Sequence, residues 1–222
     1  MSRIEWNKPG ERTFEAGVDQ GVLYPPLGPG VPWNGLTSVS EDTSGGDLES
    51  LYFDGLKYLD IVAAEDFQAT VEAFSAPVEF AACDGQKMIS QGLFVGQQPR
   101  KTFGLSYRTM KGNDLLGTEF GYKIHIVYNC TAAPAAKSSA TISDNVTPST
   151  RSWEISTVPP PASTFKPTAH IVVDSTMVDS YAIEQLEAVL YGHDGSDAYL
   201  PTVAEIVAIL DTRIPEFITE FI

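Results

Sequence analysis

The chain alternates apolar and polar residues over short runs, and this pattern predicts a mainly β protein. Residues 67–73 (FQATVEA) and 122–130 (YKIHIVYNC) both repeat with a period of two, which is typical of strands that bury one face. In the second run the predicted buried face carries Tyr122, Ile124, Ile126, Tyr128 and Cys130, whereas Lys123, His125, Val127 and Asn129 fall on the other face.

Two apolar runs within residues 48–63 flank the dipeptide Asp54-Gly55. This dipeptide adopts positive φ at low cost, so it predicts a two-residue turn and a β-hairpin. Residues 103–108 alternate as well, and a turn is expected just after them at residues 111–114. Shorter strands are expected at residues 31–39, 139–144, 152–158 and 169–175.

Helical spacing appears only near the end of the chain. Apolar residues recur at helical intervals over residues 180–191, and Gly192 supplies a C-terminal stop. A second helix is expected at residues 203–210, because Pro201 and Thr202 form a suitable start. These two helices form the predicted C-terminal helical segment, which covers residues 180–222.

The predicted architecture is one domain over residues 1–222, with irregular segments near its start. Residues 1–32 are rich in Gly and Pro and predict an irregular arm, whereas residues 41–49 predict an acidic loop. The strands together indicate an antiparallel β-sandwich or barrel of about eight strands, with a flanking α-helix and the helical C-terminal segment.

The charge balance narrows the range of functions that the sequence allows. The 222 residues include 29 acids and 14 Lys and Arg, for a net charge of −15. Since nucleic-acid binders gain affinity from Lys and Arg that displace phosphate counterions, tight binding of DNA or RNA is not expected. Cys83 and Cys130 are too few for a disulfide framework and are expected to be reduced and buried. No secretion signal and no membrane span is expected from the sequence.

The sequence offers no motif for catalysis or cofactor binding. His125 and His170 each lie in a predicted strand without a second His or Cys at metal-ligand spacing, so structural, hydrogen-bonded histidines are expected. His193 lies in a polar turn and is expected to be solvated. The acidic residues 41–49 lack the spacing of a calcium loop, and no Ser lies in a nucleophile elbow. We expect no catalytic, metal or cofactor residues and a protein that is not an enzyme.

Several segments, taken in order, resemble one family. These are GVDQGVLYPP, GPGVPWNGLTSVSE, LYFDGLKYLD, ATVEAFSAPVEFAACDG, FGLSYRTMKGND, GYKIHIVYN and LEAVLYG followed by LPTVAEI, and they extend over residues 6–210. Their order and spacing resemble the major tail protein, or tail tube protein, of bacteriophages with long, non-contractile tails, of the type found in phages of actinobacteria. No single motif among them is diagnostic.

The resemblance implies a structural virion protein that forms stacked hexameric rings. The rings would make a hollow tail tube around a tape-measure protein, with tail tip and tail terminator proteins at its ends, assembled in the host bacterial cytoplasm. DNA would pass through the tube without being held tightly, and no membrane would be involved. Residues 1–32 and 41–49 would be mobile in the free subunit and ordered on stacking. The alternative is a non-catalytic β-sandwich that binds a ligand or carbohydrate through exposed aromatic residues.

The most basic segment, residues 99–114, carries four of the 14 basic residues. Because bases that line a tube would retard DNA, we expect them to face away from the lumen and to meet acids of a neighbouring subunit. The candidate subunit-interface residues are the bases Arg100, Lys101, Arg108 and Lys111 and the acids Glu41, Asp42, Asp47 and Glu49.

Overall fold

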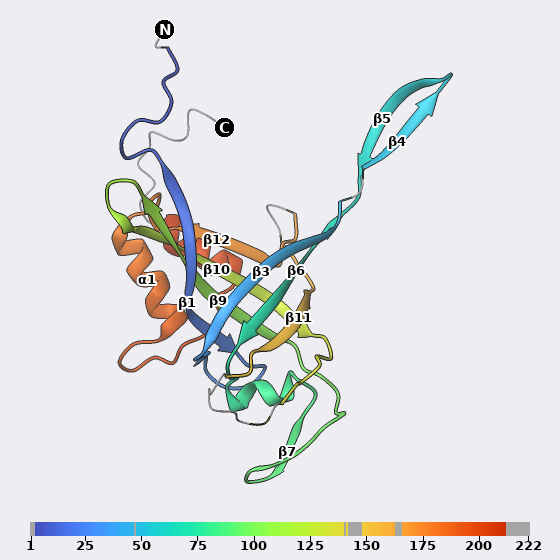
Figure 1. Cartoon of the computed structure of the whole chain (residues 1–222), viewed down its shortest axis with the longest axis vertical. Helices are drawn as coiled ribbons and strands as arrows, with labels where there is room; N and C mark the ends of the chain where they lie inside the picture. Colours follow the sequence, from blue (N-terminus) through green and yellow to red (C-terminus); the bar gives the residue numbers. More distant parts are fainter. Residues whose placement is uncertain (1–2, 47, 140, 142–147, 163–165, 212–222) are drawn as a thin grey trace.

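The computed structural model describes residues 3–46, 48–139, 141, 148–162 and 166–211 (Figure 1). Its strands are β1 (Thr13–Tyr24), β2 (Val31–Pro32), β3 (Leu36–Gly45), β4 (Leu48–Phe53), β5 (Leu56–Val62), β6 (Glu65–Ala73), β7 (Lys87–Ser90), β8 (Leu93–Val95), β9 (Phe103–Asn113), β10 (Gly117–Ala132), β11 (Arg151–Thr157) and β12 (His170–Asp174). Its helices are the 3₁₀ helix η1 (Val78–Ala82), α1 (Ser180–Tyr191) and α2 (Val203–Leu210).

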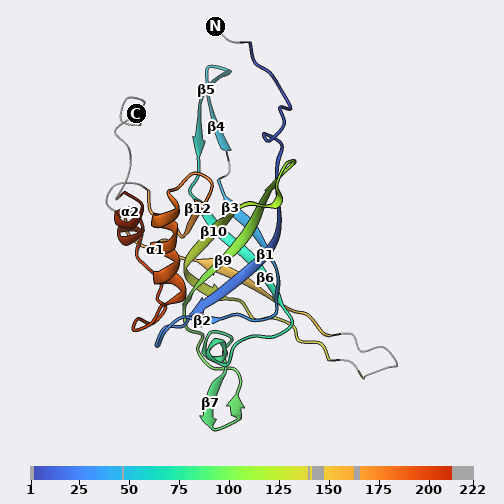
Figure 2. The same cartoon turned by 90° about the vertical axis from the view of Figure 1, so that its left-hand side faces the viewer.

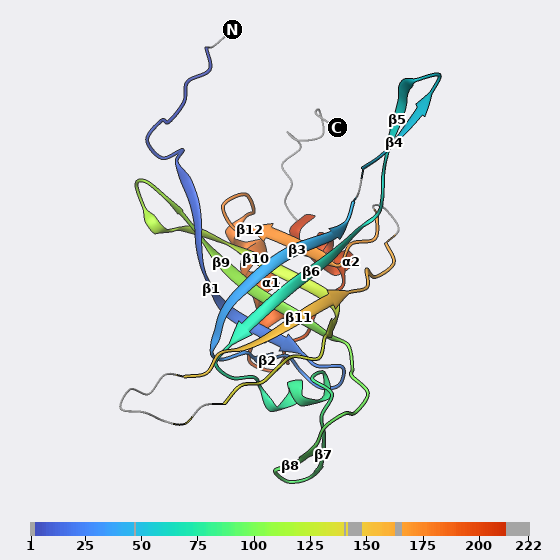
Figure 3. The same ribbon diagram turned by 45° about the vertical axis from the view of Figure 1, so that its right-hand side comes forward.

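One eight-stranded sheet forms the body, and every ladder in it is antiparallel. The strand order is β2-β1-β9-β10-β11-β6-β3. The long strand β10 has a forked pairing, with β12 along its middle and β11 at its end. The sheet curls strongly (Figure 3), but in the described part of the chain no ladder joins β3 to β1 or β2. The predicted mainly β, antiparallel fold is confirmed, as a curled sheet and not a closed barrel.

The curled sheet has a core on each face. The inner core lies in the concavity and is built around three aromatic side chains in tilted and edge-to-face contact, Trp33, Phe80 and Trp153. The outer core lies between the sheet and the two helices, where Leu186 and Leu190 of α1 are fully buried. Figure 2 shows both helices on this outer side. Both faces of the long strand β10 are therefore apolar.

A bulge moves one predicted residue to the other face of β10. Asn129 has a φ of 48°, and the pairing with β9 shifts between Val127 and Cys130. As a result Cys130 lies in the inner core with Val127, and not with Ile124 and Ile126, which face the helices. The predicted face of Cys130 was wrong because a period of two cannot continue through a bulge. Both cysteines are free and buried, as expected.

The hairpin predicted at Asp54-Gly55 is confirmed. Strands β4 and β5 pair around these two residues, whose φ angles of 49° and 77° are those of a two-residue turn with positive φ at both positions. The hairpin leaves the body as a long projection (Figure 1), and most of its side chains are exposed on both faces.

The two C-terminal helices are confirmed at the predicted bounds. The Asp179 side chain accepts a hydrogen bond from the Tyr181 backbone and caps α1, which ends at Gly192. Thr202 and Glu205 form a capping box at the start of α2, which satisfies backbone N–H groups that the first turn leaves without partners. Local capping chemistry thus sets three of the four helix ends. Among the described residues, none of the helices has the length and apolar character that a bilayer crossing requires.

The predicted irregular arm is in part a strand, and the predicted acidic loop is largely strand. Within residues 1–32, β1 is an interior strand of the sheet, and the pattern was hidden because its register shifts twice, after Ala16 and after Asp19. Residues 41–45 continue β3 along β6, and β4 begins at residue 48. Their small and acidic side chains give no apolar signal, although the backbone pairs with β6.

The remaining turn and strands that the sequence predicts have different outcomes. The turn expected at residues 111–114 lies further along, because β9 continues to Asn113 and β10 begins at Gly117. The strand expected at residues 139–144 falls mostly outside the described residues. The strands expected at residues 67–73, 152–158 and 169–175 are confirmed as β6, β11 and β12 within one or two residues.

Replacing Leu186 by alanine tests the outer core. Its side chain is fully buried between α1 and the sheet, so Leu186→Ala should lower the free energy of unfolding by about 2–5 kcal/mol. Leu116→Ala, at an exposed leucine, is the matched control and should change it by no more than about 0.5 kcal/mol. Urea denaturation followed by circular dichroism measures both, and equal losses would contradict the packing described.

Candidate functional site

Arg108, a candidate interface residue, binds an acid of its own chain. On β9 its guanidinium donates two hydrogen bonds of 2.8 Å to both carboxylate oxygens of Asp19 on β1. It also lies 4.5 Å from the ring centroid of Tyr122 on β10. The hydrogen bonds to Asp19 raise the pKa of Arg108 above its ordinary value. This paired and stacked side chain links three elements of one subunit.

Lys111 is likewise paired within the chain. Its Nζ lies 2.5 Å from an Asp174 carboxylate oxygen and 2.8 Å from Thr176 Oγ1, so it ties β9 to the end of β12. Burial opposes ionisation of Asp174 more than any single contact favours it, but the hydrogen bonds from Lys111 and Thr176 together with the Lys111 charge lower the pKa of Asp174 below its usual value. The Lys111 charge is therefore neutralised locally.

The other two candidate interface bases, Arg100 and Lys101, differ in whether their side chains are paired within the subunit. Arg100 donates to the carbonyl of Ala132 at 3.1 Å and lies 3.5 Å from the Asp84 carboxylate, which also binds Lys137 at 2.5 Å. Lys101 is exposed, and its backbone N–H donates to the carbonyl of Ala82. Three of the four predicted interface bases are thus engaged inside the subunit.

The predicted interface acids are spread over β3 and the hairpin. Asp42 accepts a hydrogen bond from the backbone of Thr43, and Glu49 is exposed on β4. Asp47 lies outside the described residues. Glu41 is not near the four bases but points across the concavity to Tyr107 and the two strand histidines. That these bases and acids meet across subunits stays a prediction.

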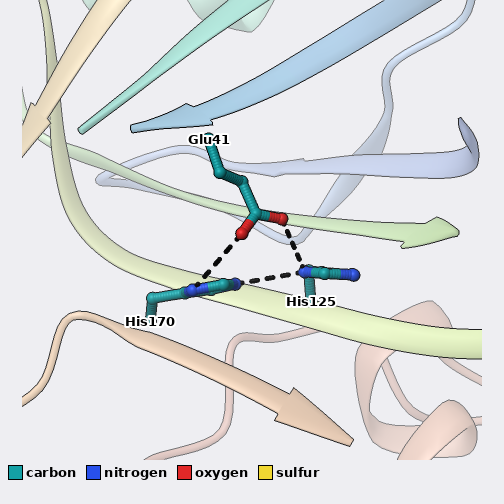
Figure 4. Close-up of side chains that lie close together, drawn as sticks. All are labelled: Glu41, His125 and His170. Carbon is teal, nitrogen blue, oxygen red and sulfur yellow. Dashed lines mark hydrogen bonds and ion pairs between the residues drawn. The ribbon is translucent and has the colours of Figure 1, made fainter. Parts of the chain in front are cut away.

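Glu41 forms a compact cluster with His125 and His170 (Figure 4). Glu41 comes from β3, His125 from β10 and His170 from β12. His125 Nδ1 lies 2.9 Å from Glu41 Oε1 and 3.1 Å from His170 Nε2, and His170 Nδ1 lies 3.9 Å from Glu41 Oε2. Nitrogen and oxygen atoms of three side chains that can accept a proton or bind a cation thus converge from three strands.

A second layer of side chains holds the cluster. Tyr107 donates its hydroxyl to Glu41 Oε1 at 2.7 Å and stacks on the His125 ring, with centroids 4.6 Å apart. Thr109 Oγ1 lies 3.0 Å from His125 Nε2, and Phe67 packs 4.3 Å from the His170 ring. Each imidazole is therefore fixed by a ring contact, and His125 also by a polar contact on its far nitrogen.

Burial keeps both histidines neutral. The His125 side chain is 7% exposed and the His170 side chain 15%, whereas Glu41 reaches solvent at 36%. Burial lowers the pKa of His170 to about 4 although the Glu41 carboxylate opposes this shift, and it also lowers the pKa of His125. At neutral pH the imidazoles thus have lone pairs for hydrogen bonding or coordination.

Sequence reasoning missed this cluster. It treated the two strand histidines separately, because they lie 45 residues apart and neither belongs to a spaced motif. They meet because β12 pairs with β10, where Val127 lies opposite His170. Glu41 was assigned to a loop, although its strand crosses the concavity. The one usable signal was that both histidines lie in strands of alternating pattern.

An apolar surface on the hairpin is the second candidate site, and we call it the hairpin surface. Its nine large apolar side chains are between 39% and 75% exposed and occupy both faces of β4 and β5. A smaller apolar group lies on the β7–β8 hairpin, at the opposite end of the molecule (Figures 1 and 3). The hairpin surface comprises Leu48, Leu51, Tyr52, Phe53, Leu56, Tyr58, Leu59, Ile61 and Val62, and the β7–β8 group comprises Met88, Ile89, Leu93 and Phe94.

Comparison with known proteins gives distant structural similarity only. No protein-family model matches the chain, and no curated protein sequence does. A chain of the PVC extracellular contractile injection system, in its extended sheath–tube complex, aligns at 13% identity and a TM-score of 0.35, covering 77% of this chain and 94% of that one. A chain of the anti-feeding prophage baseplate aligns at 8% identity and a TM-score of 0.36, covering 77% and 97%.

A chain of the PVC sheath/tube terminator aligns at 12% identity and a TM-score of 0.31, covering 77% of this chain and 99% of that one. At these TM-scores the similarities carry no conclusion about the function of this chain.

Charge reversal at Arg108 tests whether the pair with Asp19 stabilises the subunit itself. Arg108→Glu should lower the free energy of unfolding of the dilute monomer by about 1.5–3 kcal/mol, because it removes two charge-assisted hydrogen bonds and places two carboxylates together. The loss of unfolding free energy should lie toward the lower end of this range, because Asp19 is partly exposed and solvent screens its pair with Arg108.

Lys101→Glu is the matched control, because it reverses a charge at an exposed neighbouring position. Urea denaturation should show almost no change for this variant. If Arg108→Glu also left the monomer unchanged, the pair with Asp19 would contribute nothing to the stability of the fold.

Proposed function

We propose that this chain is a structural virion protein, the major tail tube subunit of a bacteriophage with a long, non-contractile tail. In this role it forms hexameric rings that stack into a hollow tube, and DNA passes through the tube during genome ejection. The role is structural and not enzymatic. The proposal combines the ordered sequence resemblance with one structural observation, the exposed apolar hairpin.

The hairpin surface is the observation that carries the proposal. A two-stranded hairpin is marginal in water unless it packs against something, and β4 and β5 pair only with each other in the described chain. Their apolar side chains are exposed on both faces, which is unusual for a surface that stays in water. Burying such side chains is worth about 1.5–3 kcal/mol each, so the hairpin favours a partner surface.

A second copy of this chain is the partner we infer. The hairpin surface lies at one end of the molecule and the smaller apolar β7–β8 group at the opposite end (Figure 1). Contacts between two different surfaces of identical subunits give a ring when the rotation between subunits closes and an open filament when it does not. A stack of rings, with the long hairpin of one subunit reaching another copy, fits this placement.

The charge distribution fits a conduit for DNA. Six copies at −15 each carry −90 in one ring, and a strongly acidic tube repels phosphates instead of binding them. The basic residues Arg100, Arg108 and Lys111 are held by acids of their own chain, so they present little free positive charge. DNA would meet the tube only in transit.

The proposed role also sets the expected partners. Inside the tube a tape-measure protein would precede the DNA, and tail tip and tail terminator proteins would bind the two ends of the stack. The subunit would be made in the host bacterial cytoplasm and would end in the tail of the virion.

Polar substitution on the hairpin tests self-assembly. Phe53 and Tyr58 form an exposed aromatic pair with centroids 6.4 Å apart. The double variant Phe53→Ser, Tyr58→Ser should raise the concentration needed for assembly at least about tenfold, because it removes apolar area buried between copies. Sedimentation velocity over a concentration series measures this, and negative-stain images identify rings or tubes.

The matched control is Leu27→Ser, Met177→Ser, which changes two equally exposed apolar side chains outside both hairpins. It should assemble like the unmodified chain, and all three proteins should unfold at similar urea concentrations. Assembly of the hairpin variant at unchanged concentration would contradict the proposal. So would an unmodified chain that stays monomeric at every concentration and binds glycans.

A further inference from the structure

We propose that Glu41, His125 and His170 bind one divalent transition-metal ion, with Zn²⁺ the best match. Their donor atoms all lie within 4.8 Å of one another. Two imidazoles and one carboxylate are a common protein donor set for zinc, and such sites leave a fourth position for water. This inference concerns the subunit itself and does not depend on the assembly proposal.

The distances between donors suit a small cation. Zinc binds His nitrogen and carboxylate oxygen at about 2.0–2.2 Å, so two ligands in tetrahedral geometry lie roughly 3.4 Å apart. His125 Nδ1 lies 2.9 Å from Glu41 Oε1 and 3.1 Å from His170 Nε2. Shifts of a few tenths of an ångström would open these two pairs to the spacing that a metal ion requires, whereas His170 and Glu41, whose donor atoms lie within 4.8 Å, would have to stay within or move to the same spacing.

The proton count also favours a cation between these atoms. When Thr109 donates to His125 Nε2, the single proton on His125 Nδ1 must serve both Glu41 and His170 Nε2. A metal ion in place of that proton can bind His125 Nδ1, the Glu41 carboxylate and His170 Nε2 at the same time. His125 then carries its proton on Nε2 and donates it to Thr109 Oγ1, which needs only rotation of the threonine hydroxyl.

The surrounding side chains already form the outer layer that metal sites require. A histidine ligand usually donates its second ring nitrogen to an oxygen, and a carboxylate ligand is usually hydrogen-bonded. Thr109 stands at 3.0 Å from His125 Nε2, and the Tyr107 hydroxyl donates to Glu41 at 2.7 Å. Burial raises the pKa of Tyr107 well above its ordinary value, so its hydroxyl stays protonated and remains a donor.

A metal ion could enter and act from the Glu41 side. Glu41 is 36% exposed, so an ion and a fourth, water ligand can reach the cluster from solvent. The ion would join β3, at the end of the sheet order, to β10 and β12 across the concavity, where no ladder among the described residues does so. Since β3 leads directly into the β4–β5 hairpin, an occupied site would fix the base of that projection.

Cobalt binding to the untagged full-length chain tests the proposal. After treatment with a chelator and its removal, the protein should bind one Co²⁺ per chain with the visible absorption of a four- or five-coordinate ion, and Zn²⁺ should displace it. Zn²⁺ well above its dissociation constant should raise the Tm by about 5 °C or more, because it binds the folded chain.

His170→Asn and Glu41→Gln should each weaken Co²⁺ binding by about a hundredfold or more and change the absorption. His193→Asn is the matched control, because it removes the one other histidine, which is exposed and lies outside the cluster. Circular dichroism establishes that each variant is folded. Absence of stoichiometric binding to the unmodified chain would overturn the proposal and leave a hydrogen-bonded cluster only. Full binding by either folded cluster variant, or its loss in His193→Asn, would also overturn it.

Discussion

Burial of both faces of the long strand β10 is the constraint on which the rest of the structure depends. Leu105 and Val127 face the inner core, whereas Ile124 and Ile126 face the helices, and all four are fully buried. A strand apolar on both faces needs a cover on each side. The helices α1 and α2 cover one face, and the curl of the sheet brings β3 and β6 over the other. This curl also carries Glu41 to the histidines of β10 and β12.

The same arrangement explains why the bases of β9 are paired within the subunit while the apolar side chains of the β4–β5 hairpin are exposed. Arg108 and Lys111 lie on a strand crowded by neighbours, so they find acids in their own chain at β1 and β12. The β4–β5 hairpin has no such neighbours, and its apolar side chains remain in water. The side chains that lack a partner surface in the isolated subunit are therefore mainly apolar and not basic. We infer that copies of the chain associate chiefly by burying these apolar side chains, while the rest of the surface stays strongly acidic.

Local signals predicted much of the fold. Asp54-Gly55 predicted the hairpin, the alternation over residues 67–73 predicted β6, and Thr202 with Gly192 set helix ends. Two of the failures share a cause, since β1 and the end of β10 contain bulges that break the period of two. The histidine cluster depends on pairing between distant strands, which a single sequence does not show. The partner of Arg108 within the subunit could not be predicted either, because Asp19 lies 89 residues away in the chain.

We propose that this chain is a subunit of a self-assembling tube, in which the exposed hairpin reaches another copy. Cryo-electron microscopy of the assemblies formed by the concentrated, purified chain tests this most directly. We predict stacked six-fold rings around a central channel, with the side chains of Phe53 and Tyr58 buried against an adjacent subunit. Particles that remain single subunits at all concentrations, or rings in which the β4–β5 hairpin projects freely into solvent, would contradict the account.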